Sequence, residues 1–217
     1  MTIEVTTKDC AGLGDAELSE MADLAAATAG WEVGRLGKEA EEWVLVSQAM
    51  QNGNLKGFMF ATLERIGGTP AMVVGVGCVA RNKSNSSILR ALMTEQYHRA
   101  LMAFPDEDVL VSMRLLSPGG MEALAKLSDI RPCGETRANG EERAWGRRLS
   151  KRYGAHAFDD RTMIARADGD DLFLDHEPAG QAGEPIPPFS DCDTAAGDYV
   201  IAWGWAMAEF LEKFRAS

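Results

Sequence analysis

Residues 72–89, MVVGVGCVARNKSNSSIL, change character halfway along. Residues 72–79 are apolar and rich in valine and glycine, which is typical of a buried strand. Residues 81–87 are polar, whereas from Ser86 to Phe104 apolar side chains recur at helical spacing, with a serine available as the N-cap. The stretch therefore predicts a strand, a polar connection and a long helix.

The polar connection has two interpretations. The N-terminus of a helix presents unpaired backbone N–H groups and the positive end of the helix dipole, and this combination binds phosphate groups. Arg81, Lys83 and Arg90 would add positive charge to such a site. A polar strand-to-helix connection capped by serine also forms without any ligand, so these residues leave both interpretations open.

The residues that precede this stretch predict a three-strand antiparallel meander. Residues 42–50 and 55–66 are strand-like, and Asn52-Gly53 between them is a strong hairpin signal because both residues tolerate positive φ. A Gly-Gly-Thr-Pro turn then leads back into the strand that ends at residue 79. Before the meander we expect a strand at 2–7, a helix at 15–30 and an irregular stretch at 31–41.

Downstream of the long helix, strands and helices alternate. Ser117 is a good N-cap, and Pro118 suits the first turn of a helix. The expected elements are a buried strand at 108–116, a helix at 117–127, an extended segment at 129–137, a helix at 141–154 and a hairpin at 161–176 around Asp168-Gly169.

The last forty residues have a different composition. Residues 177–193 carry four of the eight prolines and are interpreted as a linker without regular structure. Residues 194–217 contain an apolar stripe at helical spacing that includes Trp203 and Phe210. We therefore predict a main domain over residues 1–176 and a C-terminal amphipathic helix, which either packs against the domain or joins two copies into a homodimer.

The composition is that of a globular protein, with 46% hydrophobic and 25% charged residues. No apolar run approaches the roughly 20 residues of a membrane span, and the first residues lack the features of a signal peptide, so we predict a cytoplasmic location. The net charge of -11 opposes a general attraction to nucleic acid. Residues 131–152 nonetheless have a local basic surplus, which indicates either a solvated helix face or a surface for nucleic acid.

The sequence predicts no metal site. The four cysteines are scattered, and the three histidines lack the spacing of zinc ligands. The aspartates within residues 168–171 fit a turn better than a calcium loop. We therefore expect free thiols and no bound metal.

The order strand, helix, three-strand meander, helix, strand, helix, strands resembles that of the GCN5-related N-acetyltransferase (GNAT) superfamily. This family joins its fourth strand to its third helix through Arg-x-x-Gly-x-Gly, and RNKSNS at 81–86 is similar, with Ser84 and Ser86 at the glycine positions. LAKLSDIRPCGE at 124–135 is similar to the family's approach to its sixth strand. The resemblance covers about residues 1–137 and the hairpin at 162–175. It implies an α/β (α+β) fold, with a mixed, mainly antiparallel central sheet flanked by helices.

The resemblance also implies a reaction, the transfer of an acyl group from acetyl-CoA or another acyl-CoA to a small-molecule amine. The pyrophosphate of the donor would lie against the loop and helix start, formed by Arg81, Lys83, Ser84, Asn85, Ser86 and Ser87. The thioester carbonyl would be held by the backbone of the splayed fourth strand, at Cys78, Val79 and Ala80.

Candidate catalytic groups come from other strands. Glu64 is the first candidate for the general base and Glu42 a weaker one, while Ser112 could carry a proton through water. The usual acid of the family, a tyrosine in the fourth helix, has no counterpart in residues 118–128.

Three functions remain open at this point. The first is an acyltransferase acting on a small amine. The second is a non-catalytic binding or assembly protein with the same fold, favoured by the serines in the loop and by the missing tyrosine. The third is an enzyme of this fold that modifies a nucleic acid held by residues 131–152.

Overall fold

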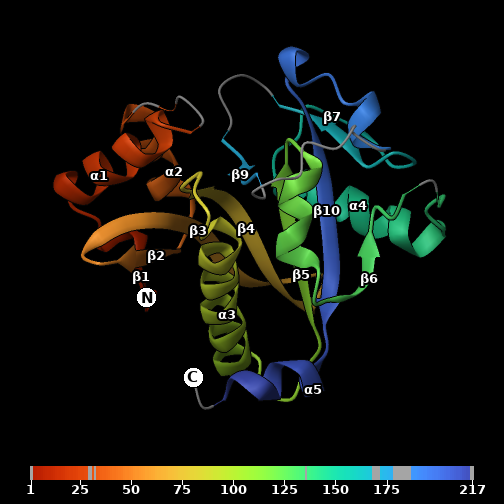
Figure 1. Cartoon of the computed structure of the whole chain (residues 1–217). Helices are drawn as coiled ribbons and strands as arrows, with labels where there is room; N and C mark the ends of the chain where they lie inside the picture. Colours follow the sequence, from red (N-terminus) through yellow and green to blue (C-terminus); the bar gives the residue numbers. More distant parts are fainter. Residues whose placement is uncertain are drawn as a thin grey trace.

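A single mixed sheet runs through the molecule (Figure 1). The computed structural model describes residues 2–28, 31, 33–134, 136–167, 172–177 and 187–215 of the 217-residue chain. Over these residues the strands follow the order β1-β2-β3-β4-β9-β5-β10-β8-β7, and β6 pairs with β10. The strands are β1 (Glu4–Asp9), β2 (Leu45–Gln51), β3 (Asn54–Ile66), β4 (Thr69–Val79), β5 (Val109–Leu115), β6 (Ser128–Arg131), β7 (Ala157–Asp159), β8 (Ile164–Arg166), β9 (Leu174–Asp175) and β10 (Asp198–Ala206).

The sheet is mainly antiparallel, as expected. Only β4, β5 and β9 pair with one another in parallel among the described strands. The predicted meander is β2, β3 and β4, and its first turn has Asn52 at φ 53° and Gly53 at φ 75°. These positive φ values confirm the hairpin that the Asn-Gly pair predicts.

Helices cover both faces of the sheet (Figure 1). One face is covered by α3 (Asn85–Ala103) together with the short α5 (Ala208–Leu211), and Ile88 and Leu92 lie in the core beneath them. The other face carries α1 (Asp15–Ala26), α2 (Val33–Glu42) and α4 (Gly140–Arg152). No helix within the described ranges is both long and apolar enough to cross a membrane.

Helix α2 replaces the irregular stretch expected at 31–41. Gly34 and Gly37 weaken the helical pattern of this segment, because glycine is a poor helix former. The helix is instead stabilised by tertiary contacts: Leu36 is fully buried and Glu39 is 8% exposed. The helix expected at 117–127 also differs from the prediction, because Pro118–Leu124 form a 3₁₀ helix, η2.

The C-terminal helix expected over residues 194–217 is wrong for its central part, because Asp198–Ala206 form β10. This strand pairs with β5 along its length from Val200 to Ala206, and also with β6 and β8. Its side chains alternate between the two apolar cores: Tyr199, Ile201 and Trp203 face one, Val200 and Ala202 the other. A strand covered on both faces is apolar at successive positions. The same run of apolar residues also fits a helix that is apolar more than halfway round, which is why a helix was expected here.

Residues 198–206 therefore belong to the main sheet, and residues 208–214 pack against α3 as α5 and a 3₁₀ helix, η5 (Glu212–Phe214). Of the expected linker at 177–193, residues 178–186 lie outside the described residues, while Phe189–Asp191 form the 3₁₀ helix η3. The expected hairpin at 161–176 is also wrong, since β8 pairs with β7 and β10, whereas β9 pairs with β4 and β5. The turn at Asp168-Gly169 lies outside the described residues.

Candidate functional site

Strands β4 and β5 separate in the middle of the sheet, next to the loop at 80–87. They pair from Ala71 with Leu110 as far as Val74 with Met113, and the pairing then stops. Gly75 is the extra residue of a bulge in β4, because Phe60 of β3 pairs with Val76 while Ala61 pairs with Val74. The bulge bends β4 away from β5, and the two strands diverge towards the N-terminus of α3, as the resemblance implies for its acyl-donor slot.

Strand β9 fills the space between the diverging strands. Leu174 pairs with Gly77 of β4 and with Leu115 of β5, and Gly77 N donates to Phe173 O at 3.3 Å. The absence of a side chain at Gly77 makes this approach possible, since a Cβ there would lie 2.6 Å from Leu174 Cδ1. The segment contributes to both cores, with Leu174 on the α3 face and Phe173 on the opposite face.

Several of the loop residues that were expected to hold a pyrophosphate make hydrogen bonds within the chain. Ser84 N and Ser86 N donate to the side-chain oxygens of Asn82 and Asn85, each at 2.7 Å. Asn85 Nδ2 donates to the carbonyl oxygen of Glu177. These bonds satisfy two of the backbone N–H groups that would otherwise face an anion at the start of α3.

Carboxylates surround the same loop. Arg81 Nη2 lies 3.2 Å from Asp175 Oδ1 and 3.5 Å from Glu177 Oε1. Ser86 Oγ donates to Glu122 Oε2 at 3.0 Å, and His176 Nε2 lies 2.7 Å from the same oxygen. Lys83 and Ser87 are exposed, whereas Cys78 and Val79 are buried inside the sheet and Ala80 N donates to Lys56 O at 2.8 Å. In this arrangement β9 occupies the space between β4 and β5, and the carboxylates of Glu122, Asp175 and Glu177 lie beside the loop.

The two candidate catalytic residues have partners of their own. Glu64 accepts a hydrogen bond from Arg152 Nε. Ser112 is fully buried, with its Oγ 3.0 Å from the hydroxyl of Tyr153, which in turn donates to Val74 O at 3.1 Å. No contact joins Glu64 to Ser112 in the described part of the chain, and Glu42 is exposed.

Tyr153 was missed by the sequence analysis, which looked for a tyrosine only within 118–128. It follows α4 and lies where β4 and β5 begin to separate. Burial raises the pKa of its hydroxyl well above the ordinary value. Tyr153 is therefore a buried hydrogen-bond donor that ties Val74 to α4.

A buried ion pair between Arg114 and Glu39 lies beside the bulge of β4. The sequence did not indicate this pair because Glu39 lies on α2, far from Arg114 along the chain. Arg114 Nη2 lies 3.7 Å from Glu39 Oε2, and Trp43 Nε1 donates to the same oxygen at 2.7 Å. Arg114 also donates to Gly75 O, from Nε at 3.4 Å and Nη2 at 3.3 Å. Its guanidinium carbon lies 5.2 Å from the centre of the Phe173 ring. Arg114 thus links β5, the bulge and the segment that leads into β9.

The titration of Glu39 is a testable consequence of its burial. Burial raises the pKa of this carboxyl above its ordinary value of 4.5, against the opposing effects of Arg114 and Trp43. The folded state therefore holds the Glu39 proton more tightly than the unfolded chain does. The stabilisation from this proton is complete below the unfolded pKa and is lost as the pH rises through the folded pKa.

In Glu39→Gln this titration is absent, while the side-chain oxygen can still accept from Trp43. We expect the free energy of unfolding of the variant to decline less than that of the wild type as the pH is raised from about 4.5. Urea denaturation over a pH series measures this slope. Glu41→Gln, which changes an exposed carboxylate of the same helix, is the control. Parallel curves for the wild type and Glu39→Gln would contradict the prediction.

Comparisons with known proteins give only remote likenesses. No protein-family model matches the chain, and no curated protein matches it. The aminoglycoside 6'-N-acetyltransferase from Enterococcus faecium is 17% identical over 54% of this chain and 64% of that chain, with a TM-score of 0.41, so the match spans less than two thirds of that enzyme.

Two further structures are similar over more of the chain. The ribosomal-protein-S18-alanine N-acetyltransferase from Escherichia coli is 12% identical over 94% of this chain and 95% of its own, with a TM-score of 0.45. The IAA acetyltransferase from Bacillus cereus is 11% identical over 94% of this chain and 100% of its own, with a TM-score of 0.44. At such scores the fold is established by the strand order and register. The meander, the divergence of β4 and β5 before α3 and the position of β6 together make this a divergent chain of the GNAT fold.

Proposed function

We propose that this chain is a non-catalytic binding protein built on the GNAT fold. The observation that supports this proposal is the position of β9, which pairs with Gly77 and Leu115 in the slot that the resemblance gives to the acyl donor. The contacts of Glu64 with Arg152 and of Ser112 with Tyr153 give both residues partners within the chain.

The energy needed to open the slot also favours this proposal. An acyl donor could enter only if the segment left, which would expose Leu172, Phe173 and Leu174, now 1%, 8% and 3% exposed. Exposing three large apolar side chains costs about 5–9 kcal/mol. A penalty of that size weakens binding by about a thousandfold or more.

An N-acyltransferase that uses acyl-CoA and a small amine is the second candidate. It is favoured by the divergence of β4 and β5 beside Arg81 and the start of α3. This candidate requires β9 to act as a movable segment that the acyl donor displaces. The two candidates therefore differ in how ligand binding responds to a weaker β9.

A thermal-shift titration with acetyl-CoA, a longer acyl-CoA and CoA separates the candidates. A ligand present at about 100 times its Kd stabilises the native state by about 2.7 kcal/mol, which is readily detected. We expect no shift for the wild type or for Leu174→Ala, in which β9 has lost its main contact with the α3 face.

Leu101→Ala, the same substitution at a buried position of α3, is the control for a general loss of stability. A shift in the wild type that grows in Leu174→Ala but not in Leu101→Ala would reject the non-catalytic function and support the acyltransferase. Turnover of acetyl-CoA with a panel of amines would then identify the acceptor.

A further inference from the structure

Three arginines line one cavity at the side of the molecule that carries α4. The cavity has a volume of about 560 Å³ and is lined by Arg137, Ala138, Arg143, Arg161 and Thr162. Arg143 lies in the first turn of α4, Arg137 precedes that helix, and Arg161 lies in the turn between β7 and β8. None of these residues belongs to β4, β9 or the loop at 80–87, so the cavity is distinct from the slot described above.

Among the described residues these three arginines have no carboxylate partner, unlike most other arginines of that part of the chain. In the part of the chain that the structure describes, no ion pair involves Arg137, Arg143 or Arg161. Two nearby acids are engaged elsewhere: Glu142 with Arg131 at 2.7 Å, and Asp160 with Arg147. Asp159 Oδ1 accepts the backbone N–H of Arg161 at 2.9 Å.

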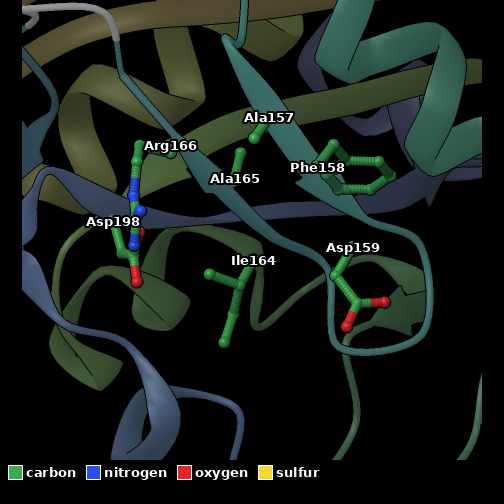
Figure 2. Close-up of a pocket in the computed structure, with 7 residues that line it drawn as sticks. All are labelled: Ala157, Phe158, Asp159, Ile164, Ala165, Arg166 and Asp198. Carbon is green, nitrogen blue, oxygen red and sulfur yellow. The ribbon is translucent and has the colours of Figure 1, made fainter.

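A neighbouring hollow shows the contrast. It has a volume of about 340 Å³ and lies along β7, β8 and the start of β10. Figure 2 shows its one arginine, Arg166, beside Asp198, with Arg166 Nε 2.7 Å from Asp198 Oδ1. That hollow has its positive charge neutralised by the chain, whereas the three-arginine cavity does not.

A second observation favours an anion-binding role for this cavity. Arg143 Nε is buried and has no hydrogen-bond partner among the described residues. A buried donor without a partner is costly, and the cost is greater for a charged group. Three unpaired guanidinium groups around one cavity also repel each other, and an anion bound between them would remove both penalties.

We propose that Arg137, Arg143 and Arg161 bind the phosphate group of a small phosphorylated ligand. The planar fork of a guanidinium matches the oxygens of a phosphate, and several such forks provide the donors that a phosphate dianion requires. The volume falls in the range of about 300–1,000 Å³ typical of small-molecule sites. This inference rests on the binding function proposed above, because the phosphorylated ligand would be the one that the protein binds. The cavity itself is the same whether or not β9 stays between β4 and β5.

Nucleic acid fits this surface less well. Its binding requires many phosphate contacts along a continuous basic surface. Outside the cavity two basic side chains of α4 are neutralised, Arg147 by Asp160 and Arg152 by Glu64, and the whole chain carries a net charge of -11. The three arginines of the cavity line one hollow and not a long basic surface.

Isothermal titration calorimetry with inorganic phosphate and with adenosine 5'-monophosphate tests the proposal on the whole chain at low salt. We expect adenosine 5'-monophosphate to bind and adenosine not to bind. Arg137→Gln, Arg143→Gln and Arg161→Gln should each weaken binding by about 10-fold to 100-fold. Arg99→Gln on α3, which removes the same charge outside the cavity, should leave the affinity unchanged.

The thermal stability of the same variants gives a second readout, of opposite sign. Without ligand, Arg143→Gln should melt at the same temperature as the wild type or higher, because it removes repulsion and a buried charged donor. With phosphate present, the wild type should gain more stability than the variant.

Failure of both phosphate probes to bind, or an equal loss in Arg99→Gln, would overturn the proposal. If citrate binds and neither phosphate probe does, the cavity is a site for a polycarboxylate and the proposal is wrong. If a short DNA duplex binds, and Arg148→Gln weakens its binding as much as the cavity variants do, the surface binds nucleic acid instead. None of these outcomes depends on acyl-CoA binding, so they are distinguishable from a failure of the proposed function.

Discussion

Gly75→Ala is expected to lower the free energy of unfolding by about 3 kcal/mol or more. A Cβ at this position would fall inside the indole ring of Trp43, which is 5% exposed and packed in the core. Neither partner can move easily, because Gly75 O accepts from Arg114 and Trp43 Nε1 donates to Glu39. The midpoint of urea or thermal denaturation measures the loss.

Two controls show whether the clash is the cause. Gly37→Ala places a methyl group on helix α2 where no described heavy atom lies within 4 Å, and alanine is the better helix former, so this variant should be neutral or slightly stabilised. In a Trp43→Ala background the added methyl has room, so the double variant should lose less stability than the two single losses combined. Additive losses would contradict the steric explanation.

Arg114→Ala is expected to cost about 3–5 kcal/mol, the usual effect of breaking a buried ion pair on one side. Glu39 would remain buried without its cation, and Gly75 O would lose the two donors that replace the missing strand partner. The guanidinium also lies over the rings of Trp43, Tyr153 and Phe173, so its removal leaves a cavity.

The double variant Arg114→Met with Glu39→Gln is the matched test. It replaces the ion pair by neutral groups of similar size, and we expect it to be more stable than Arg114→Ala because no buried charge is left unpaired. Equilibrium denaturation of the single and double variants gives the coupling energy. If Arg114→Ala lowers the free energy of unfolding by less than about 1 kcal/mol, or if the double variant is no more stable than Arg114→Ala, the ion pair does not stabilise the bulge of β4.

The elements that depend on local signals could be predicted from the sequence. Asn52-Gly53 requires positive φ whatever surrounds it, and the long apolar stripe of α3 is a pattern within one segment. The meander follows from three consecutive strands joined by short turns. For the same reason the position of the loop at 80–87, between a buried strand and a helix, was predicted correctly.

The elements that depend on distant partners could not be predicted in this way. Residues around Trp203 are apolar at successive positions, and only their pairing with β5 makes them a strand. The contacts of Arg81 are with Asp175 and Glu177, more than ninety positions along the chain. No local pattern indicates that residues 172–177 return to the centre of the sheet. The sequence therefore could not show that this segment contacts the loop at 80–87.

The pairing of β5 with β10 also affects how the chain can fold. Val109 of β5 pairs with Ala206 of β10. The edge of β5 that pairs with β10 therefore has no partner until a segment far along the chain has been synthesised. Contacts at such separation slow folding, since loop closure must precede them. During that interval β5, a strand buried at all seven positions in the native state, presents an unpaired apolar edge. Such an edge is prone to aggregate, so a chaperone that shields it during synthesis would matter more here than for a chain whose central strands are adjacent in sequence.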